Sequence, residues 1–187
     1  MNHAVVLLWA KILIAVPRSR LFLKTKQLNG ETTRQSVMDR FAVHGIGPER
    51  LILEGGAPRA ELLAAYQRID IALDPFPYPG GTTSIEALWM GVPVLTLAGD
   101  RFLSHIGESI LHNAGLSDWI AIDTDDYVAR AVTHAQDLPR LSNLRGQLRQ
   151  QVLESPLFDA PRFAGHFEAA LRCMWVQWCN QQPQKKL

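Results

Sequence analysis

Short apolar segments that favour β-strands alternate along this chain with longer segments that favour helices. Strands are predicted at residues 20–25, 50–54, 70–74, 92–97 and 119–122. The segment VPVLTL (92–97) is apolar nearly throughout, which is typical of a parallel strand that is buried on both faces. Because parallel neighbours are joined by crossover connections that are usually helical, the alternation indicates helices packed on a parallel sheet. The sequence therefore predicts an α/β fold with a doubly wound parallel sheet.

The helical segments divide the chain into regions. Helices are predicted at residues 5–16, 32–44, 58–69, 82–90, 102–115, 125–136, 141–155 and 161–182. The last two follow each other without a strand between them, so we expect two C-terminal helices outside the alternating unit. We accordingly predict an α/β lobe over 1–138, a helical extension over 139–182 and a polar tail over 183–187.

Composition excludes several classes of function. The chain has 187 residues, 47% hydrophobic content and a net charge of +1, which gives no reason to expect nucleic acid or an anionic membrane as a partner. The apolar run at residues 5–16 is too short to span a bilayer, is interrupted by Lys11 and lacks the flanks of a signal peptide. Cys173 and Cys179 do not have the spacing of metal ligands, so we expect reduced thiols and a cytoplasmic protein.

The segment YPGGTTSIEALWMG (78–91) has the composition of a loop that leads into a helix. Prolines and glycines up to Gly81 exclude a regular element, and no glycine or proline interrupts the run from Thr82 to Met90. A helix that starts here presents unpaired N–H groups and a positive dipole end, which suits a phosphate. The same residues also match a capping box from Thr83 to Glu86, and the two interpretations remain open at this point.

Three loops converge on the expected ligand-binding edge of the sheet. They are residues 24–26, 55–58 and 75–83, each following a predicted strand. Ligands of open α/β sheets bind beyond the carboxyl ends of the strands, so these loops are candidates for a nucleotide site. Lys24 could bridge a phosphate, although a solvated lysine is the alternative. Arg59 begins the helix after the second loop, where a cation is unfavourable to the dipole, and a bound anion would explain it.

The helix start at the third loop carries groups that suit a nucleotide. Thr82 and Glu86 are spaced one turn apart and share a face. A carboxylate there can accept two vicinal hydroxyls of a ribose, and the threonines can donate to phosphate oxygens. Gly80 and Gly81 would let a ligand approach the backbone closely, unless they only form a turn.

No catalytic base can be identified from the residues. His105 is the only histidine near an expected strand-end loop, and a lone histidine is usually structural. Asp74 and the other aspartates at strand ends or helix starts are explained by capping. We expect no metal site and no cofactor, since no cluster of metal ligands occurs.

Two segments resemble a known family. Residues 70–116 and 154–175 are similar to the catalytic region of O-linked N-acetylglucosamine transferases of the bacterial and SPINDLY type. The resemblance covers nearly the whole chain, and its most specific part is GGTTSIEALWMGVPV. It implies that residues 1–138 form the Rossmann-like, nucleotide-sugar-binding C-terminal lobe of a B-type glycosyltransferase.

The resemblance implies roles for the residues of the loop and helix start. Gly80, Gly81, Thr82 and Thr83 align with the family segment that contacts the diphosphate and the sugar. Glu86 aligns with the acidic residue that binds the ribose, where many relatives have aspartate.

The second loop aligns with the part of the family's site that lies near the uracil. Ala57, Pro58 and Arg59 match an Ala-Pro-Lys motif, with arginine in place of lysine. Two positions depart from the family pattern, because Leu62 and Gly81 stand where some members have histidine. These departures place in doubt any contact that a histidine would supply.

The resemblance also implies an activity and partners. UDP-N-acetylglucosamine would be the donor substrate, Ser and Thr residues of proteins the acceptors, and no metal would be needed. The family's N-terminal lobe, with the acceptor cleft and the proposed base, and its tetratricopeptide repeats have no counterpart in these 187 residues. The isolated chain is then expected to be inactive. The alternatives are a truncated, non-catalytic nucleotide-binding module, and another B-type glycosyltransferase or a sugar-nucleotide epimerase.

Overall fold

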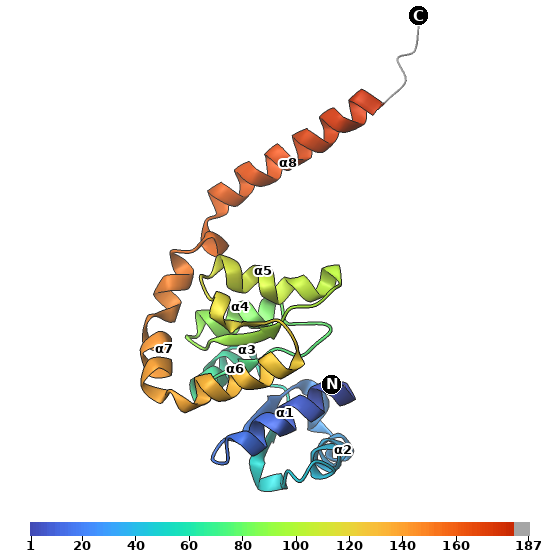
Figure 1. The fold of residues 1–187 in the computed structure, drawn as a ribbon, viewed down its shortest axis with the longest axis vertical. Coiled ribbons are helices and arrows are strands. Elements are labelled where there is room, and N and C mark those ends of the chain that lie inside the picture. The colour runs from blue at the N-terminus through green and yellow to red at the C-terminus, as the bar shows by residue number, and fades with distance from the viewer. Residues whose placement is uncertain (182–187) are drawn as a thin grey trace, which may run out of the picture.

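All five predicted strands are present and lie within two residues of their predicted bounds. A computed structural model describes residues 1–181 of the chain (Figure 1). The strands are β1 (Leu21–Lys24), β2 (Leu51–Glu54), β3 (Ala72–Leu73), β4 (Val94–Leu97) and β5 (Ile120–Ala121). Every strand pair is parallel, which confirms the prediction of a parallel α/β architecture.

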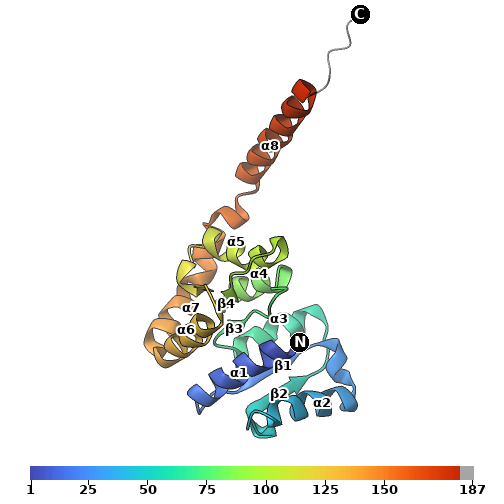
Figure 2. The same ribbon diagram turned by 45° about the vertical axis from the view of Figure 1, so that its right-hand side comes forward.

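The strands form two hydrogen-bonded ladders where a continuous sheet was expected. β1 pairs with β2, and β3, β4 and β5 form a second ladder with β4 in the middle. Figure 2 shows the β1–β2 ladder near α1 and α2, and β3 and β4 in the other part of the lobe. The alternation of strands and helices sets the strand direction, but it does not determine which strands become neighbours.

The helices also follow the prediction. They are α1 (His3–Ala15), α2 (Glu31–Ala42), α3 (Arg59–Ala65), α4 (Thr82–Trp89), α5 (His105–Asn113), α6 (Thr124–Gln136), α7 (Leu138–Leu153) and α8 (Ala160–Gln181). α7 begins three residues before the predicted start because the Asp137 carboxylate accepts from the Arg140 amide and caps the helix. Pro139 is accommodated in the first turn, where its missing N–H has no helical partner to lose.

The core lies where helices cover β4. Val94 and Leu95 of this strand are fully buried, and α4, α5 and α6 all contact it. Figure 1 shows α4 and α5 on one side of the strand and α6 on the other. Each buried side chain of this size contributes about 1.5–3 kcal/mol through removal from water. This packing fixes the position of the α4 start relative to the ends of β3 and β4.

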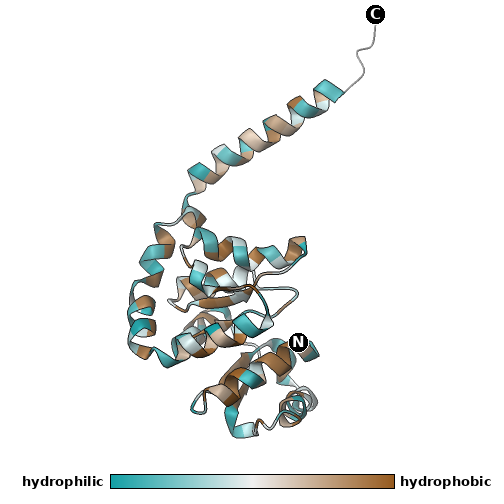
Figure 3. Cartoon of the chain, viewed as in Figure 1, coloured by the Kyte–Doolittle hydropathy of each residue, from teal (hydrophilic) through white to brown (hydrophobic). Residues whose placement is uncertain are grey.

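The two C-terminal helices pack differently. α7 contacts α4 and α6, and its Leu141, Leu148 and Val152 are buried. α8 has no buried residue and extends away from the lobe (Figure 3). The division at residue 138 stays a prediction, and the predicted tail at 183–187 lies outside the described residues. No helix within residues 1–181 is both long and apolar enough to cross a membrane.

Candidate functional site

The loop after β3 ends in the first turn of α4, and no capping box forms there. Gly81 is the N-cap, and no side chain caps the helix. The amides of Ser84 and Ile85 both donate to the Gly81 carbonyl at 3.1 Å, so the first turn closes two residues earlier than the capping box requires. Thr83 therefore lies inside the first turn. The capping-box interpretation of Thr83 and Glu86 is wrong for this reason.

The start of α4 leaves backbone donors unpaired. Within residues 1–181, the amides of Gly81, Thr82 and Thr83 donate to no other group of the chain. The preceding amide, from Gly80, donates to the Asp74 Oδ1 atom at 3.1 Å. Unpaired amides and the positive end of the helix dipole together favour an anion at this position. The structure therefore shows free backbone donors at the helix start, and phosphate binding there stays a prediction.

Glu86 and Arg59 bring the starts of α3 and α4 together. The Arg59 Nη1 atom lies 3.0 Å from the Glu86 Oε1 atom. The Glu86 side chain is only 11% exposed, whereas that of Arg59 is 73% exposed. The ion pair thus balances the negative charge of the mostly buried Glu86 carboxylate. It also explains why a cation, Arg59, stands at the start of α3, and no bound anion is needed for this. Tyr66 completes the contact between the helices, because its hydroxyl donates to the Thr83 carbonyl at 3.2 Å.

The loops after β1 and β2 lie against each other. The Gly56 amide donates to the Asn29 Oδ1 atom at 3.1 Å, and a Cβ at Gly56 would lie 3.2 Å from the Lys26 Cα atom. Ala57 and Leu62 are partly buried on either side of the α3 start. These residues form a surface beside the Glu86–Arg59 pair.

The Lys24 side chain forms an ion pair within the chain. Its Nζ atom lies 3.0 Å from the Glu54 Oε2 atom, and Arg68 binds the other oxygen of Glu54 at 2.7 Å. These two cations lower the pKa of the Glu54 carboxyl, the hydrogen bond from Lys24 having the larger effect. The structure therefore groups Lys24 with Glu54 and Arg68, and a contact between Lys24 and a phosphate remains a prediction.

Asp74 is the polar residue at the site that sequence reasoning missed. It is 6% exposed, and its Oδ1 atom accepts from the Gly80 amide and, at 3.0 Å, from the Ser84 hydroxyl. Burial raises the pKa of the Asp74 carboxyl to about 6, against the opposing effect of these hydrogen bonds. Its position directly after a predicted buried strand could have indicated a role in the site, because ligands bind at strand ends in this architecture.

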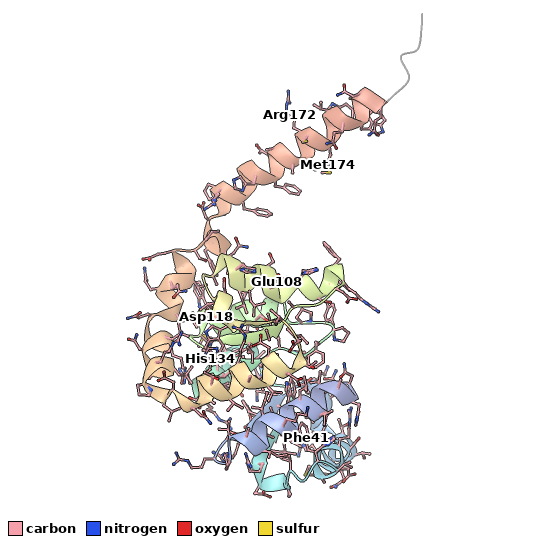
Figure 4. All side chains as sticks on the ribbon, viewed as in Figure 1. Phe41, Glu108, Asp118, His134, Arg172 and Met174 are labelled. Atoms are coloured by element: carbon pink, nitrogen blue, oxygen red, sulfur yellow. The ribbon has the colours of Figure 1, made fainter. Side chains whose placement is uncertain are left out.

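Two other groups of titratable residues belong to elements other than α4. His105 pairs with Glu108 of the same helix at 2.6 Å and is about half exposed, so its contacts are local. Asp118 and His134 line a cavity of about 420 Å³ (Figure 4). Trp119, which stacks on His134, precedes β5, so this cavity lies at the amino end of that strand. Since the strands are parallel, the cavity is at the opposite edge from the loop before α4.

Comparisons with known proteins match this chain over most of its length. Residues 1–167 match the family model described as Glycosyl transferase family 41. The chain is 39% identical over 173 residues to a probable UDP-N-acetylglucosamine–peptide N-acetylglucosaminyltransferase SPINDLY of Solanum lycopersicum. It is 29% identical over 176 residues to the UDP-N-acetylglucosamine–peptide N-acetylglucosaminyltransferase of Caenorhabditis elegans. These matches cover 92% and 94% of this chain, but only 19% and 15% of the two relatives.

A solved structure has the same fold. A mutant of the Thermobaculum terrenum O-GlcNAc transferase aligns with a TM-score of 0.88 and 41% sequence identity. The alignment covers 94% of this chain and 34% of that chain. The chain described here thus spans about a fifth of the length of the SPINDLY relatives and about a third of the solved structure.

Proposed function

This chain belongs to glycosyl transferase family 41, and we propose that it is the nucleotide-sugar-binding part of a protein O-N-acetylglucosaminyltransferase. The donor would be UDP-N-acetylglucosamine, and the acceptors would be Ser and Thr hydroxyls of proteins. The names of the relatives support this substrate pair.

The observation that carries the proposal is the unpaired start of α4. In the proposed complex, the diphosphate of the donor accepts hydrogen bonds from the amides of Gly81, Thr82 and Thr83. Negative charge grows on the leaving diphosphate as the bond to the sugar breaks, and oriented amides stabilise such charge in the transition state. The glycines would allow the diphosphate to approach the backbone, and the threonine hydroxyls add further donors.

The surface beside this anion site would hold the nucleoside. Glu86 would accept hydrogen bonds from the two ribose hydroxyls, which are charge-assisted because the carboxylate is ionised. Its ion pair with Arg59 lies on the same side, so the arginine would border the bound nucleoside. Ala57 and Leu62 would flank the base through backbone and apolar contacts.

The wider setting of the site is part of the same proposal. The acceptor cleft, the N-terminal lobe and tetratricopeptide repeats would be supplied by sequence beyond the matched segment, which makes up 19% of the SPINDLY relative. We assign no metal or organic cofactor, since the amides and the helix dipole would meet the charge of the diphosphate. A cytoplasmic location is supported by Cys173 and Cys179, which are both free and exposed.

A non-catalytic nucleotide-binding module is the second candidate. It is favoured by His105, whose side chain forms an ion pair with Glu108 of the same helix. The relatives named above are transferases, and this gives no support to the epimerase alternative.

The proposal is tested by titrating the ¹⁵N-labelled chain with UDP and following its amide resonances. We expect the largest shifts at Gly81, Thr82 and Thr83, with smaller shifts around Glu86. Uridine, which lacks the diphosphate, is the matched control and should leave the three amides nearly unchanged. Saturable UDP binding that shifts amides elsewhere, or the absence of binding at millimolar UDP, would contradict the proposal.

A further inference from the structure

A buried polar cluster lies beneath the loop that precedes α4. It consists of Asp74, Ser84 and Thr96, which are 6%, 3% and 0% exposed, together with Gly107. These residues come from the end of β3, the first turn of α4, β4 and α5 respectively. The Asp74 cluster therefore joins the elements that surround the proposed diphosphate site.

The Asp74 carboxylate connects the two ends of the loop. Its Oδ1 atom accepts from the Gly80 amide at 3.1 Å and from the Ser84 hydroxyl at 3.0 Å. Gly80 is the last residue before the N-cap, and Ser84 lies in the first turn of the helix. One oxygen atom thus binds a residue on each side of the N-cap.

The backbone of Asp74 is fixed from two directions. Its amide donates to the Leu95 carbonyl at 2.9 Å within the ladder. Its carbonyl accepts from the Tyr127 hydroxyl at 3.0 Å, and that hydroxyl accepts from the Trp9 Nε1 atom at 3.3 Å. The carboxylate is therefore presented to the loop from a rigid base in the core.

Gly107 brings α5 close to the other side of the carboxylate. A Cβ atom at this position would lie 2.3 Å from the Thr96 Oγ1 atom and 3.0 Å from the Asp74 Oδ2 atom. Within residues 1–181, neither of these buried oxygens makes a hydrogen bond of normal length, although the Thr96 hydroxyl is close enough to help lower the pKa of Asp74. α5 therefore covers this side of the cluster, and it can pack this closely only because residue 107 is a glycine.

This arrangement lowers the free energy of unfolding, so a contribution to stability does not explain it. No cation pairs with Asp74 in the described part of the chain, and burial of an uncompensated carboxylate is unfavourable. The ionisable side chains that face it are Tyr127 and Tyr66. Burial is the main cause that raises the pKa of both; the charge of Asp74 adds to it, after the larger effect of Glu86 on Tyr66. His105 and Glu108 flank Gly107 on α5 and pair with each other. Local departures of this kind are expected at functional sites.

We propose that Asp74 is a positioning residue, whose carboxylate holds the loop so that the amides of Gly81, Thr82 and Thr83 stay directed toward the donor diphosphate. This inference rests on the proposed function. Asp74 turns the Gly80 amide inward, so the next three amides are left free at the helix start. These two hydrogen bonds need an acceptor oxygen at this position, and the Asp74 side chain supplies it.

The test uses the full 187-residue chain and three variants. Asp74→Ala removes the acceptor, whereas Asp74→Asn keeps an oxygen that can accept from Gly80 and Ser84. Ser84→Ala removes one of the two donors and gives a milder change if Asp74→Ala does not fold. Hydrogen exchange of the Gly80 amide reports on the loop, exchange of the Leu95 amide reports on the core, and UDP titration reports on binding.

We expect Asp74→Ala to accelerate exchange at Gly80 and to weaken UDP binding, each by about tenfold or more, with exchange at Leu95 nearly unchanged. Ser84→Ala should give a smaller acceleration at Gly80, and Asp74→Asn should restore both quantities to within about threefold of the wild type. Unchanged exchange at Gly80 in Asp74→Ala and Ser84→Ala would overturn the inference. Faster exchange at Gly80 with unaltered UDP affinity would overturn the role in binding. If the wild type does not bind UDP, the proposed function fails, and the exchange at Gly80 alone decides whether Asp74 positions the loop.

Discussion

The buried carboxylate of Asp74 leads to a specific prediction for the substitution Asp74→Asn. Asparagine has nearly the same shape, and its Oδ1 atom can accept from the Gly80 amide and the Ser84 hydroxyl as the carboxylate does. Its Nδ2 group can donate to the Thr96 hydroxyl oxygen, which has no partner within residues 1–181. The substitution therefore removes the charge while keeping the hydrogen bonds.

The magnitude follows from the pKa of Asp74. Burial raises this pKa from the ordinary 3.8 to about 6. Between these values the folded chain retains a proton that the unfolded chain has lost, so the free energy of unfolding decreases as pH rises through this window. At about 1.4 kcal/mol per pKa unit, the full cost above pH 6 is about 3 kcal/mol. Below about pH 4, both states are protonated and the cost vanishes.

Asp74→Asn should therefore be more stable than the wild type at pH 7.5, by about 2–3 kcal/mol, and the difference should disappear near pH 4. For a chain of this size, this corresponds to a Tm increase of about 5–10 °C. Thermal melting of both proteins between pH 4 and pH 8 measures the effect. An Asp74→Asn variant that is less stable than the wild type across this range would show instead that the charge of Asp74 stabilises the fold.

Three further predictions concern other parts of the chain. Gly107→Ala should destabilise the fold by about 1–3 kcal/mol in thermal melting, because its Cβ would clash with a buried hydroxyl. The matched control Gly146→Ala, in open space on α7, should stabilise it by about 0.5–1 kcal/mol, and equal effects of the two would contradict this. The exposed apolar side chains of α8, including Trp175 and Trp178, should bind a hydrophobic dye and promote self-association. A chain that stays monomeric at high concentration and binds no dye would contradict the prediction that this helix packs against a partner. The isolated chain, incubated with labelled UDP-N-acetylglucosamine and acceptor peptides, should transfer no more sugar than a heat-denatured sample; clear turnover would show that it contains a base.

The elements of the fold were predictable because each has a local signature. Apolar strands, helical periodicity and glycine at helix ends are properties of short segments, and they placed the strands within two residues of their bounds. The pairing of strands into two ladders was not predictable in the same way. It depends on contacts between segments far apart in the chain, and the alternation of elements is compatible with several orders.

The site was predictable only in part, for a related reason. The loop and the helix start at Thr82 follow from glycine and proline in the sequence, whereas the partner of Glu86 is Arg59, which lies on another helix. The role of Asp74 was missed because a carboxylate at a strand end has the same local sequence whether it is exposed or buried. Its burial depends on β4 and on the close approach of α5 at Gly107.

If the start of α4 and Glu86 form a sugar-nucleotide site, the substitution Glu86→Gln should lower the affinity for UDP. Glutamine keeps the shape but replaces charge-assisted hydrogen bonds to the ribose with neutral ones. The change should cost about 1–2 kcal/mol of binding, or roughly five- to thirty-fold in affinity. Loss of the pair with the exposed Arg59 should change stability by no more than about 0.5 kcal/mol.

Calorimetric titration with UDP should be carried out on the wild type, on Glu86→Gln and on Glu61→Gln, which neutralises an exposed carboxylate of α3 as the matched control. We expect the roughly five- to thirty-fold loss of affinity for Glu86→Gln alone, with the three melting curves nearly superimposed. An affinity of Glu86→Gln equal to that of the wild type would contradict the assignment of Glu86 to the ribose, and with it the proposed site.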